Sequence, residues 1–298
     1  MKRALLVVNP SSGGEKAKDF ENKMREKLDT HFDEVLVKHT QKQFDATNFV
    51  KKACEDKFDS VFLMGGDGTV NEGINGIAEQ DYRPNFGFIP LGTVNDLARA
   101  LNISLDPDEA IDNLDFNTLT SLDIGKVNDK YFMNIVGVGT IPEAINDTGV
   151  EEKTKFGVFA YIFKGLQKVL DNKPYTFDIV IDDTQKEITT SLLLVCSTRS
   201  IGGLEHILKD AKVNDGYLHL VYTKDETAMD LIKAIPDVIG GINESTDNIG
   251  YIDFKKASIK VQGDEKLTIN YDGEEGGPLP IEVKVLPSHI NVYHGVAK

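Results

Sequence analysis

The sequence predicts an α/β domain with a parallel sheet, followed by a domain built as an antiparallel β-sandwich. Short apolar runs alternate with helical patterns over residues 1–122, whereas residues 123–287 contain many short apolar runs separated by turn residues. A chain of 298 residues is long enough to bury the cores of two such domains. We therefore expect a domain boundary between residues 122 and 123.

Residues 1–122 are expected to alternate between strands and helices. The predicted strands cover residues 4–8, 34–38, 60–64 and 86–89, and the predicted helices cover residues 15–30, 46–55, 69–78 and 95–101. Strands that alternate with helices form βαβ units, which produce a parallel sheet with helices on both faces. Right-handed crossovers then place the loops after the strands along one edge, where open α/β sheets bind ligands.

The pattern after residue 122 is typical of an antiparallel β domain. The predicted strands cover residues 123–127, 131–136, 175–181, 187–196, 217–222, 251–261, 266–271 and 279–285. Asp-Gly, Asn-Asp and Gly-Gly pairs between these runs are turn signals. Two helical intervals, residues 157–170 and 228–239, interrupt the strands.

Composition excludes several classes of protein. Thirty-three Lys and Arg against 48 Asp and Glu give a net charge of −15, which argues against a protein that wraps nucleic acid. The same excess means that any contact with a membrane would have to be local. No apolar run reaches about 18 residues, so no transmembrane helix is expected. Cys54 and Cys196 are interpreted as inert structural thiols, which suits a reducing cytoplasm.

The strongest local signal is a glycine-rich turn between a predicted strand and a predicted helix, Met64-Gly65-Gly66-Asp67-Gly68-Thr69-Val70-Asn71-Glu72. Glycines let a backbone approach a ligand closely, and the N-terminus of a helix offers unpaired N–H groups to an anion. Asp67 beside a phosphate is unfavourable by charge unless Mg²⁺ or ordered water lies between them. The motif therefore predicts a site for a nucleoside polyphosphate with its metal. The alternative is a plain turn with Asp67 or Thr69 as N-cap, although a cap does not need three glycines.

Two further loops follow predicted strands of the same sheet. Pro90-Leu91-Gly92-Thr93-Val94-Asn95-Asp96 comes after the strand at 86–89, and Asn9-Pro10-Ser11-Ser12-Gly13-Gly14 comes after the first strand. Each is a weak signal alone, because strand-to-helix turns capped by Asn are common. Since all three loops fall at one edge of the sheet, we interpret them as parts of one site.

Motifs for other chemistries are missing. The sequence has no G-x-x-x-x-G-K-[ST] and no G-x-G-x-x-G, which counts against a P-loop enzyme and a dinucleotide-binding protein. It also lacks H-E-x-x-H, paired C-x-x-C and G-x-S-x-G, the signs of a zinc site or a hydrolase.

Two Asp-Gly pairs in the second half, Asp215-Gly216 and Asp272-Gly273, are typical of hairpin turns. The residues alone leave open whether either pair is catalytic. Asp272 and Glu274 do place two carboxylates at one strand end, which suits proton abstraction and metal binding.

Taken together, these motifs resemble the diacylglycerol kinase catalytic-domain family, particularly the soluble bacterial diacylglycerol kinases and related lipid kinases. The resemblance covers nearly the whole chain in matching order, through Asn9-Pro10, Gly13, Thr40, residues 65–72, residues 90–96, Gly202-Gly203, Asp215-Gly216 and Asp272-Gly273-Glu274. The Gly-Gly-Asp-Gly-Thr element also resembles NAD kinases and phosphofructokinases, which implies an N-terminal domain of that kind. The Gly-Thr-x-Asn-Asp and late Asp-Gly-Glu elements are specific to lipid kinases.

The resemblance implies an ATP-dependent kinase that phosphorylates diacylglycerol to phosphatidic acid. It implies that ATP lies along Asn9, Pro10, Ser11, Ser12, Gly13, Thr40, Gly66, Asp67, Gly68, Thr69, Val70, Asn71, Glu72 and Thr93. Asp67 with Asn95 or Asp96 would hold Mg²⁺ and water around the phosphates. The cleft would lie between the domains, and residues 288–298 would return to complete the first domain.

The resemblance also assigns roles in the second domain. Asp272 would be the general base that takes the proton from the lipid hydroxyl, and Glu274 would lie close to the nucleotide metal. A second, structural Mg²⁺ would bind Asp215 and the main-chain oxygens of Lys212 and Tyr217.

Two residues depart from the family pattern. Ser197 stands where Asn is usual, and Thr140 follows Gly139 where an acidic residue is common. Both fall on the expected lipid side, so phosphatidylglycerol, a sphingoid base or NAD stays open as the acceptor. The alternative of a different class is a non-catalytic regulator that binds nucleotide or lipid.

The helical interval at 157–170 is the candidate for membrane contact. Lysines and aromatic residues interleave there: Lys153, Lys155, Phe156, Phe159, Tyr161, Phe163, Lys164 and Lys168. An interfacial helix would explain this pattern, but the ordinary alternative is a helix packed on the core with a solvated lysine face. We expect a cytoplasmic protein that associates transiently with membranes through its lipid substrate. The sequence leaves open whether it forms a homodimer.

Overall fold

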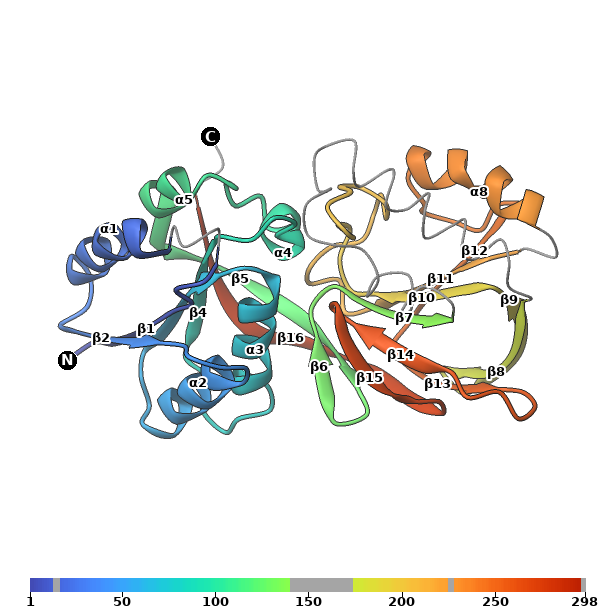
Figure 1. The fold of residues 1–298 in the computed structure, drawn as a ribbon, viewed down its shortest axis with the longest axis horizontal. Coiled ribbons are helices and arrows are strands. Elements are labelled where there is room, and N and C mark those ends of the chain that lie inside the picture. The colour runs from blue at the N-terminus through green and yellow to red at the C-terminus, as the bar shows by residue number, and fades with distance from the viewer. Residues whose placement is uncertain (13–16, 140–173, 225–227, 296–298) are drawn as a thin grey trace. The chain divides into compact units, whose positions relative to one another are not determined.

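The computed structural model describes residues 1–12, 17–139, 174–224 and 228–295. The chain divides into two compact units (Figure 1). Unit 1 combines Met1–Ile124 with Pro287–Lys298, and unit 2 comprises Gly125–Leu286. The end of the chain therefore belongs to the same unit as its beginning.

Unit 1 is an α/β domain with a parallel sheet, as predicted. Its strands are β1 (Arg3–Val8), β2 (Glu34–His39), β3 (Ser60–Gly65), β4 (Asn85–Pro90) and the end of β16 (Ile281–Gly295). Its helices are α1 (Ala17–Asp29), α2 (Asp45–Glu55), α3 (Asp67–Ile77), α4 (Asp96–Ala100) and α5 (Pro107–Asn113). The strand order is β2-β1-β3-β4-β16, and every neighbouring pair is parallel. Strand β5 (Leu114–Val127) runs from unit 1 into unit 2 and pairs with β16.

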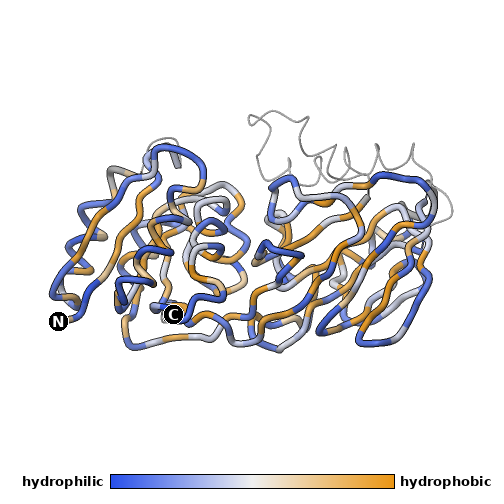
Figure 2. The backbone as a smooth tube through the Cα atoms, turned by 90° about the horizontal axis from the view of Figure 1, so that it is seen from below, coloured by the Kyte–Doolittle hydropathy of each residue, from blue (hydrophilic) through white to orange (hydrophobic). Residues whose placement is uncertain are grey.

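Helices cover both faces of the unit 1 sheet. Helices α1 and α5 lie on one face and α2 and α3 on the other (Figure 1). On the first face, Met24 and Leu28 of α1 join Leu6 and Phe62 of the sheet in one buried cluster. Because both faces are covered, the central strands are continuous apolar runs rather than alternating ones, and Figure 2 shows these hydrophobic segments between hydrophilic connections.

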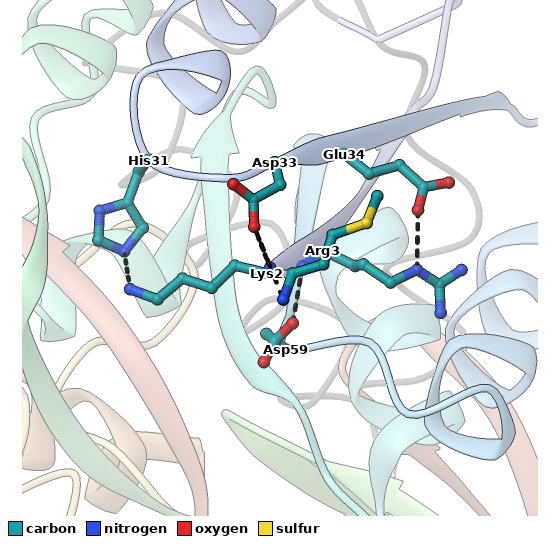
Figure 3. Close-up of polar contacts among 7 residues, drawn as sticks. Lys2, Arg3, His31, Asp33, Glu34 and Asp59 are labelled. Carbon is teal, nitrogen blue, oxygen red and sulfur yellow. Dashed lines mark hydrogen bonds and ion pairs between the residues drawn. The ribbon is translucent and has the colours of Figure 1, made fainter.

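Polar contacts at the amino end of β1 hold it in register with β2 and β3 (Figure 3). The Arg3 backbone N donates to the Asp59 carboxylate at 2.6 Å, and Arg3 Nε donates to Glu34 at 3.0 Å. The Lys2 backbone N donates to the Asp33 carboxylate at 2.6 Å. These contacts occupy the amino edge of the sheet, opposite the edge that carries the loops after β1, β3 and β4.

Unit 2 is an antiparallel β-sandwich, as predicted. One layer has the order β12-β11-β10-β7-β14-β15, and the other contains β9, β8, β13 and the first part of β16. The elements are β6 (Lys130–Phe132), β7 (Ile135–Gly139), β8 (Tyr175–Ile181), β9 (Thr184–Thr190), β10 (Leu192–Cys196), β11 (Leu218–Thr223), α8 (Ala228–Gly240), β12 (Ile249–Phe254), β13 (Lys256–Val261), β14 (Thr268–Tyr271) and β15 (Glu274–Pro278). Val136 and Leu193 from the first layer share one core with Phe177 and Ile259 from the second.

The structure corrects three predicted strands of unit 2. The runs at 131–136, 187–196 and 251–261 each form two strands, one in each layer of the sandwich. Only one or two residues separate the strands of each pair: Met133-Asn134, Ser191 and Lys255. Because both layers bury side chains in the same core, so short an interruption does not show where one strand ends and the next begins.

Unit 1 also differs from the prediction in two places. Helix α5 was not predicted, although its start carries ordinary signals: Pro107 is its first residue, and the Asp106 carboxylate accepts a hydrogen bond from Glu109 N at 3.1 Å. Strand β5 begins at Leu114, well before the predicted start at residue 123.

The predicted helix at 157–170 and its lysines lie outside the described residues. Among the residues that are described, no helix is long and apolar enough to span a membrane.

We predict that the native protein reacts slowly with thiolate-directed reagents. Cys54 and Cys196 are free and buried, and burial raises the pKa of Cys54 to about 11 and that of Cys196 still further. At pH 8 only about one Cys54 thiol in a thousand would then be ionised. Alkylation followed by mass spectrometry should show both thiols protected until urea is added. Rapid labelling of the folded protein would contradict this.

Candidate functional site

Three loops meet at the carboxyl edge of the unit 1 sheet, after β1, β3 and β4. Asn9 links the first two, because its backbone N donates to Met64 O at 2.9 Å and its Nδ2 donates to Thr69 Oγ1 at 2.9 Å. Leu91 N donates to Gly65 O at 2.8 Å and links the second loop to the third. The three loops that the sequence grouped are thus in direct contact.

The loops after β3 and β4 touch backbone to backbone. A Cβ on Gly92 would lie 2.8 Å from Gly66 Cα, and a Cβ on Gly66 would lie 3.1 Å from Gly92 Cα. Gly68 is different, because a Cβ there would meet nothing within 4 Å. Packing therefore explains Gly66 and Gly92 but not Gly68, which is exposed in the first turn of α3, where a ligand can approach the backbone.

The Asp67 side chain joins the same two loops by capping α4. Its Oδ2 accepts a hydrogen bond from Asn95 N at 2.7 Å, and its Oδ1 accepts one from Asp96 N at 2.9 Å. Asn95 is in the left-handed region, with φ 54°, and its side-chain amide bonds both backbone groups of Gly92. Asp67 is therefore a link between two loops, a role that the sequence did not predict.

The charges around Asp67 are suited to a cation. Burial raises the pKa of Asp67, the negative charge of Asp96 adds to this rise, and the N–H donors of Asn95 and Asp96 oppose it. A cation beside Asp67 and Asp96 would relieve the repulsion between the two carboxylates. An ionised carboxylate can accept about four hydrogen bonds, so the capping bonds leave room for water or metal.

The described residues contain no group of three or more His, Cys, Asp and Glu side chains arranged to hold a metal. Mg²⁺ usually keeps several waters and binds through one or two carboxylates together with substrate phosphates. Asp67 and Asp96 fit that kind of site better than a cage of protein side chains.

The carboxylate of Glu72 holds the start of α2. Its Oε1 accepts a hydrogen bond from Phe44 N at 2.9 Å, and its Oε2 accepts one from Ala46 N at 3.1 Å. Thr47 Oγ1 donates to Glu72 O at 2.9 Å. These bonds tie the loop after β2, which contains Thr40, to helix α3.

The other residues expected to contact ATP differ in exposure. Val70 and Asn71 are buried in α3, so their side chains pack within unit 1. The residues that keep exposed surface at the edge are Asn9, Pro10, Ser11, Ser12, Thr40 and Thr93. Gly13 lies outside the described residues.

In unit 2, Asp272 and Gly273 form the turn between β14 and β15, with φ values of 47° and 89°. The Asp272 carboxylate accepts hydrogen bonds from three consecutive backbone N–H groups: Met133 at 2.7 Å, Asn134 at 3.0 Å and Ile135 at 2.9 Å. Bonds of this kind stabilise a charged carboxylate and fix its position. We call these three N–H groups, of residues 133–135, the cradle of Asp272. The cradle distinguishes Asp272 from an ordinary hairpin-turn residue.

The cradle contains a residue that sequence reasoning missed. Asn134 is 4% exposed, and among the described residues its Oδ1 has no hydrogen-bond partner. Its backbone O accepts a hydrogen bond from Ser197 N at 2.9 Å, and the Ser197 hydroxyl donates to Met133 O. Ser197 therefore supports the cradle. The segment gave no sequence signal because it lies where the chain passes from β6 to β7.

Glu274 and Asp215 occupy different parts of unit 2. Glu274 is exposed at the first position of β15, paired with Tyr271. Asp215 precedes β11, which is three strand spacings from β14 in the same layer, roughly 14 Å. Asp215 and Asp272 therefore belong to separate sites.

Asp215 is held by its own loop. Its carboxylate accepts hydrogen bonds from Lys212 N at 2.9 Å and Tyr217 N at 3.0 Å. Burial alone would raise the pKa of Asp215, but His219 and these N–H donors outweigh burial and lower it. His219 Nε2 lies 3.4 Å from Oδ2 without hydrogen-bond alignment. An ionised carboxylate is a suitable ligand for Mg²⁺.

Both halves of the chain match known domain families. Residues 3–127 match the diacylglycerol kinase catalytic domain, and residues 135–294 match the YegS C-terminal NAD kinase beta sandwich-like domain. The chain is also similar to the crystal structure of a Bacillus anthracis protein, with a TM-score of 0.84 and 27% sequence identity. The match covers 99% of this chain and 97% of that chain.

Similar proteins extend over almost the full length of the sequence. A Streptococcus pneumoniae protein is 39% identical over 98% of each chain. Its name describes a lipid kinase and does not say which lipid is phosphorylated. The diacylglycerol kinase of Bacillus subtilis is 36% identical over 98% of this chain and 96% of its own. The chain therefore belongs to the diacylglycerol kinase family, a family of lipid kinases.

Proposed function

We propose that this protein is an ATP-dependent lipid kinase that transfers the γ-phosphate of ATP to the hydroxyl group of diacylglycerol. The observation that carries the proposal is the set of linked loops at the carboxyl edge of unit 1, with Gly68 open at the start of α3. Relatives named diacylglycerol kinase supply the acceptor in the proposal.

Unit 1 would bind the nucleotide. The phosphates would lie against the first turn of α3 at Gly66, Gly68 and Thr69, where backbone N–H groups and the helix dipole favour an anion. Asp67 and Asp96 would hold Mg²⁺ through water, and the metal supplies positive charge at the phosphates. Phosphoryl transfer depends mainly on such alignment and charge stabilisation.

Unit 2 would supply the acceptor chemistry. Asp272 would take the proton from the lipid hydroxyl while the three N–H groups of its cradle keep the carboxylate in place. A general base of this kind contributes about 10²–10⁴-fold to a rate. Asp215 would bind a structural Mg²⁺ with the main-chain oxygens of Lys212 and Tyr217.

A lipid acceptor requires contact with a membrane surface. We propose a cytoplasmic protein that visits the membrane transiently, because the net charge of −15 does not support binding to anionic lipid by the whole body.

Two glycine variants test the nucleotide site. Gly92→Ala should lower the free energy of unfolding by about 1–3 kcal/mol, because the new methyl group overlaps Gly66. Gly68→Ala should leave the melting temperature unchanged or higher, since its methyl group meets no protein atom. We expect calorimetric titration to show Mg·ATP binding at least about tenfold weaker in Gly68→Ala. Binding at the wild-type level would contradict a phosphate site at this turn.

Replacement of the proposed base tests the reaction. Asp272→Asn should lower kcat for label transfer from γ-labelled ATP to dioleoylglycerol in mixed micelles by about 10²–10⁴-fold, with little change in ATP affinity. Asp183→Asn is the matched control, because Asp183 also has a positive φ in a hairpin turn but is exposed and forms a surface ion pair with Lys256.

The melting temperature of Asp272→Asn shows whether the cradle survives the change. A folded variant with full activity would remove Asp272 as the base. Label that enters another lipid, but not phosphatidic acid, would keep the kinase and replace its acceptor.

A further inference from the structure

Phe44 has an unusual conformation and position. It is the residue before α2, with φ 69° and ψ 4°, and it is 56% exposed. A positive φ is uncommon for residues other than glycine and is a real outlier for a bulky one. Outliers of this kind persist only where the surrounding structure enforces them, and they cluster at ligand-binding and active sites.

The surrounding structure does enforce this conformation. Glu72 accepts hydrogen bonds from Phe44 N and Ala46 N, at 2.9 and 3.1 Å. Asp45 accepts hydrogen bonds from Gln41 N at 2.8 Å and Lys42 N at 3.0 Å. The loop after β2 is therefore a built structure that holds an aromatic side chain out from the surface.

Local stability does not explain an aromatic residue at this position. The residue before a helix stabilises it most when it is Ser, Thr, Asp, Asn or Gly. Phe44 makes no side-chain capping bond to α2. Glycine would also adopt the left-handed conformation without strain. Core packing is not the reason either, because the residue is more than half exposed.

The position of Phe44 relates it to the nucleotide site. Thr40 N donates to Val8 O at 2.9 Å, so the loop begins at the carboxyl edge beside the loop after β1. Glu72, which holds Phe44, is five residues after Asp67 in α3, about 7.5 Å along the helix axis. Phe44 thus lies in the loop that starts at this edge, held by a residue about one and a half helical turns along α3 from the phosphate loop.

We propose that Phe44 is a stacking platform for the nucleobase, one face of its ring lying against the purine of the bound nucleotide. The inference rests on the proposed ATP site in unit 1 and adds a contact for the base to contacts for the phosphates. Every base has a π-face, so an aromatic platform strengthens binding without strong discrimination between bases. Glu72 is the positioning residue that presents Phe44.

The test compares ligands with and without a base. Phe44→Gly should weaken Mg·ATP binding about 5- to 100-fold in calorimetric titration, because stacking on one base is lost. Binding of Mg·tripolyphosphate, which has no base, should stay unchanged. The melting temperature should rise, because glycine relieves the backbone strain. Phe44→Trp should keep the wild-type affinity for ATP.

Tyr82→Ala is the control, because Tyr82 is another partly exposed aromatic residue of unit 1, with 37% exposure. It should bind both ligands like the wild type. Equal loss of ATP and tripolyphosphate in Phe44→Gly would show a disturbed loop and overturn the stacking role, as would unchanged ATP binding. Failure of the wild type to bind either ligand would instead overturn the proposed function itself, and the inference with it.

Discussion

The carboxyl edge of the unit 1 sheet depends on one carboxylate. Asp67 receives the backbone N–H groups of Asn95 and Asp96, at 2.7 and 2.9 Å, and thereby joins the loop after β3 to the loop after β4. Gly66 and Gly92 permit the two backbones to touch at this point. With the loops fixed, the first turn of α3 keeps an open position at Gly68, and two carboxylates stay close enough for a cation to be favourable. Phosphate binding and metal binding would both follow from this link.

Unit 2 uses the same physical device for a different purpose. Asp272 receives three consecutive backbone N–H groups and is thereby fixed in a tight turn, with Ser197 bracing the strand segment that donates them. In both units, a side chain that chemistry would use is first positioned by hydrogen bonds to the main chain. A fixed carboxylate needs little rearrangement during phosphoryl transfer, which is where positioning contributes most. The loop after β2 extends the pattern, since Glu72 positions Phe44 in the same way.

The sequence predicted what depends on neighbouring residues. Periodicity gave the parallel sheet of unit 1 and the antiparallel strands of unit 2, and the glycine-rich turn was located from its own residues. It grouped the three loops of unit 1 but did not predict the individual hydrogen bonds between distant segments: Asp67 bonds residues 28 and 29 positions away, and Asp272 bonds residues 137 to 139 positions away. Strands that cross between the layers of the sandwich were merged for a similar reason, because hydropathy records burial but not which layer buries a residue. The sequence did not indicate Phe44, because the unusual feature of this residue is its positive φ angle.

The most direct measurement is the affinity of Asp67→Ala for Mg·ATP, determined by titration beside the wild type. Asp106→Ala is the matched control, because the Asp106 carboxylate accepts an ordinary capping bond from Glu109 N at the start of α5 in the same unit, and this bond stays within one helix. We expect Asp67→Ala to retain its helix content by circular dichroism and to bind Mg·ATP more than about tenfold more weakly, while Asp106→Ala binds normally. Unchanged affinity in Asp67→Ala would contradict the central role of this carboxylate.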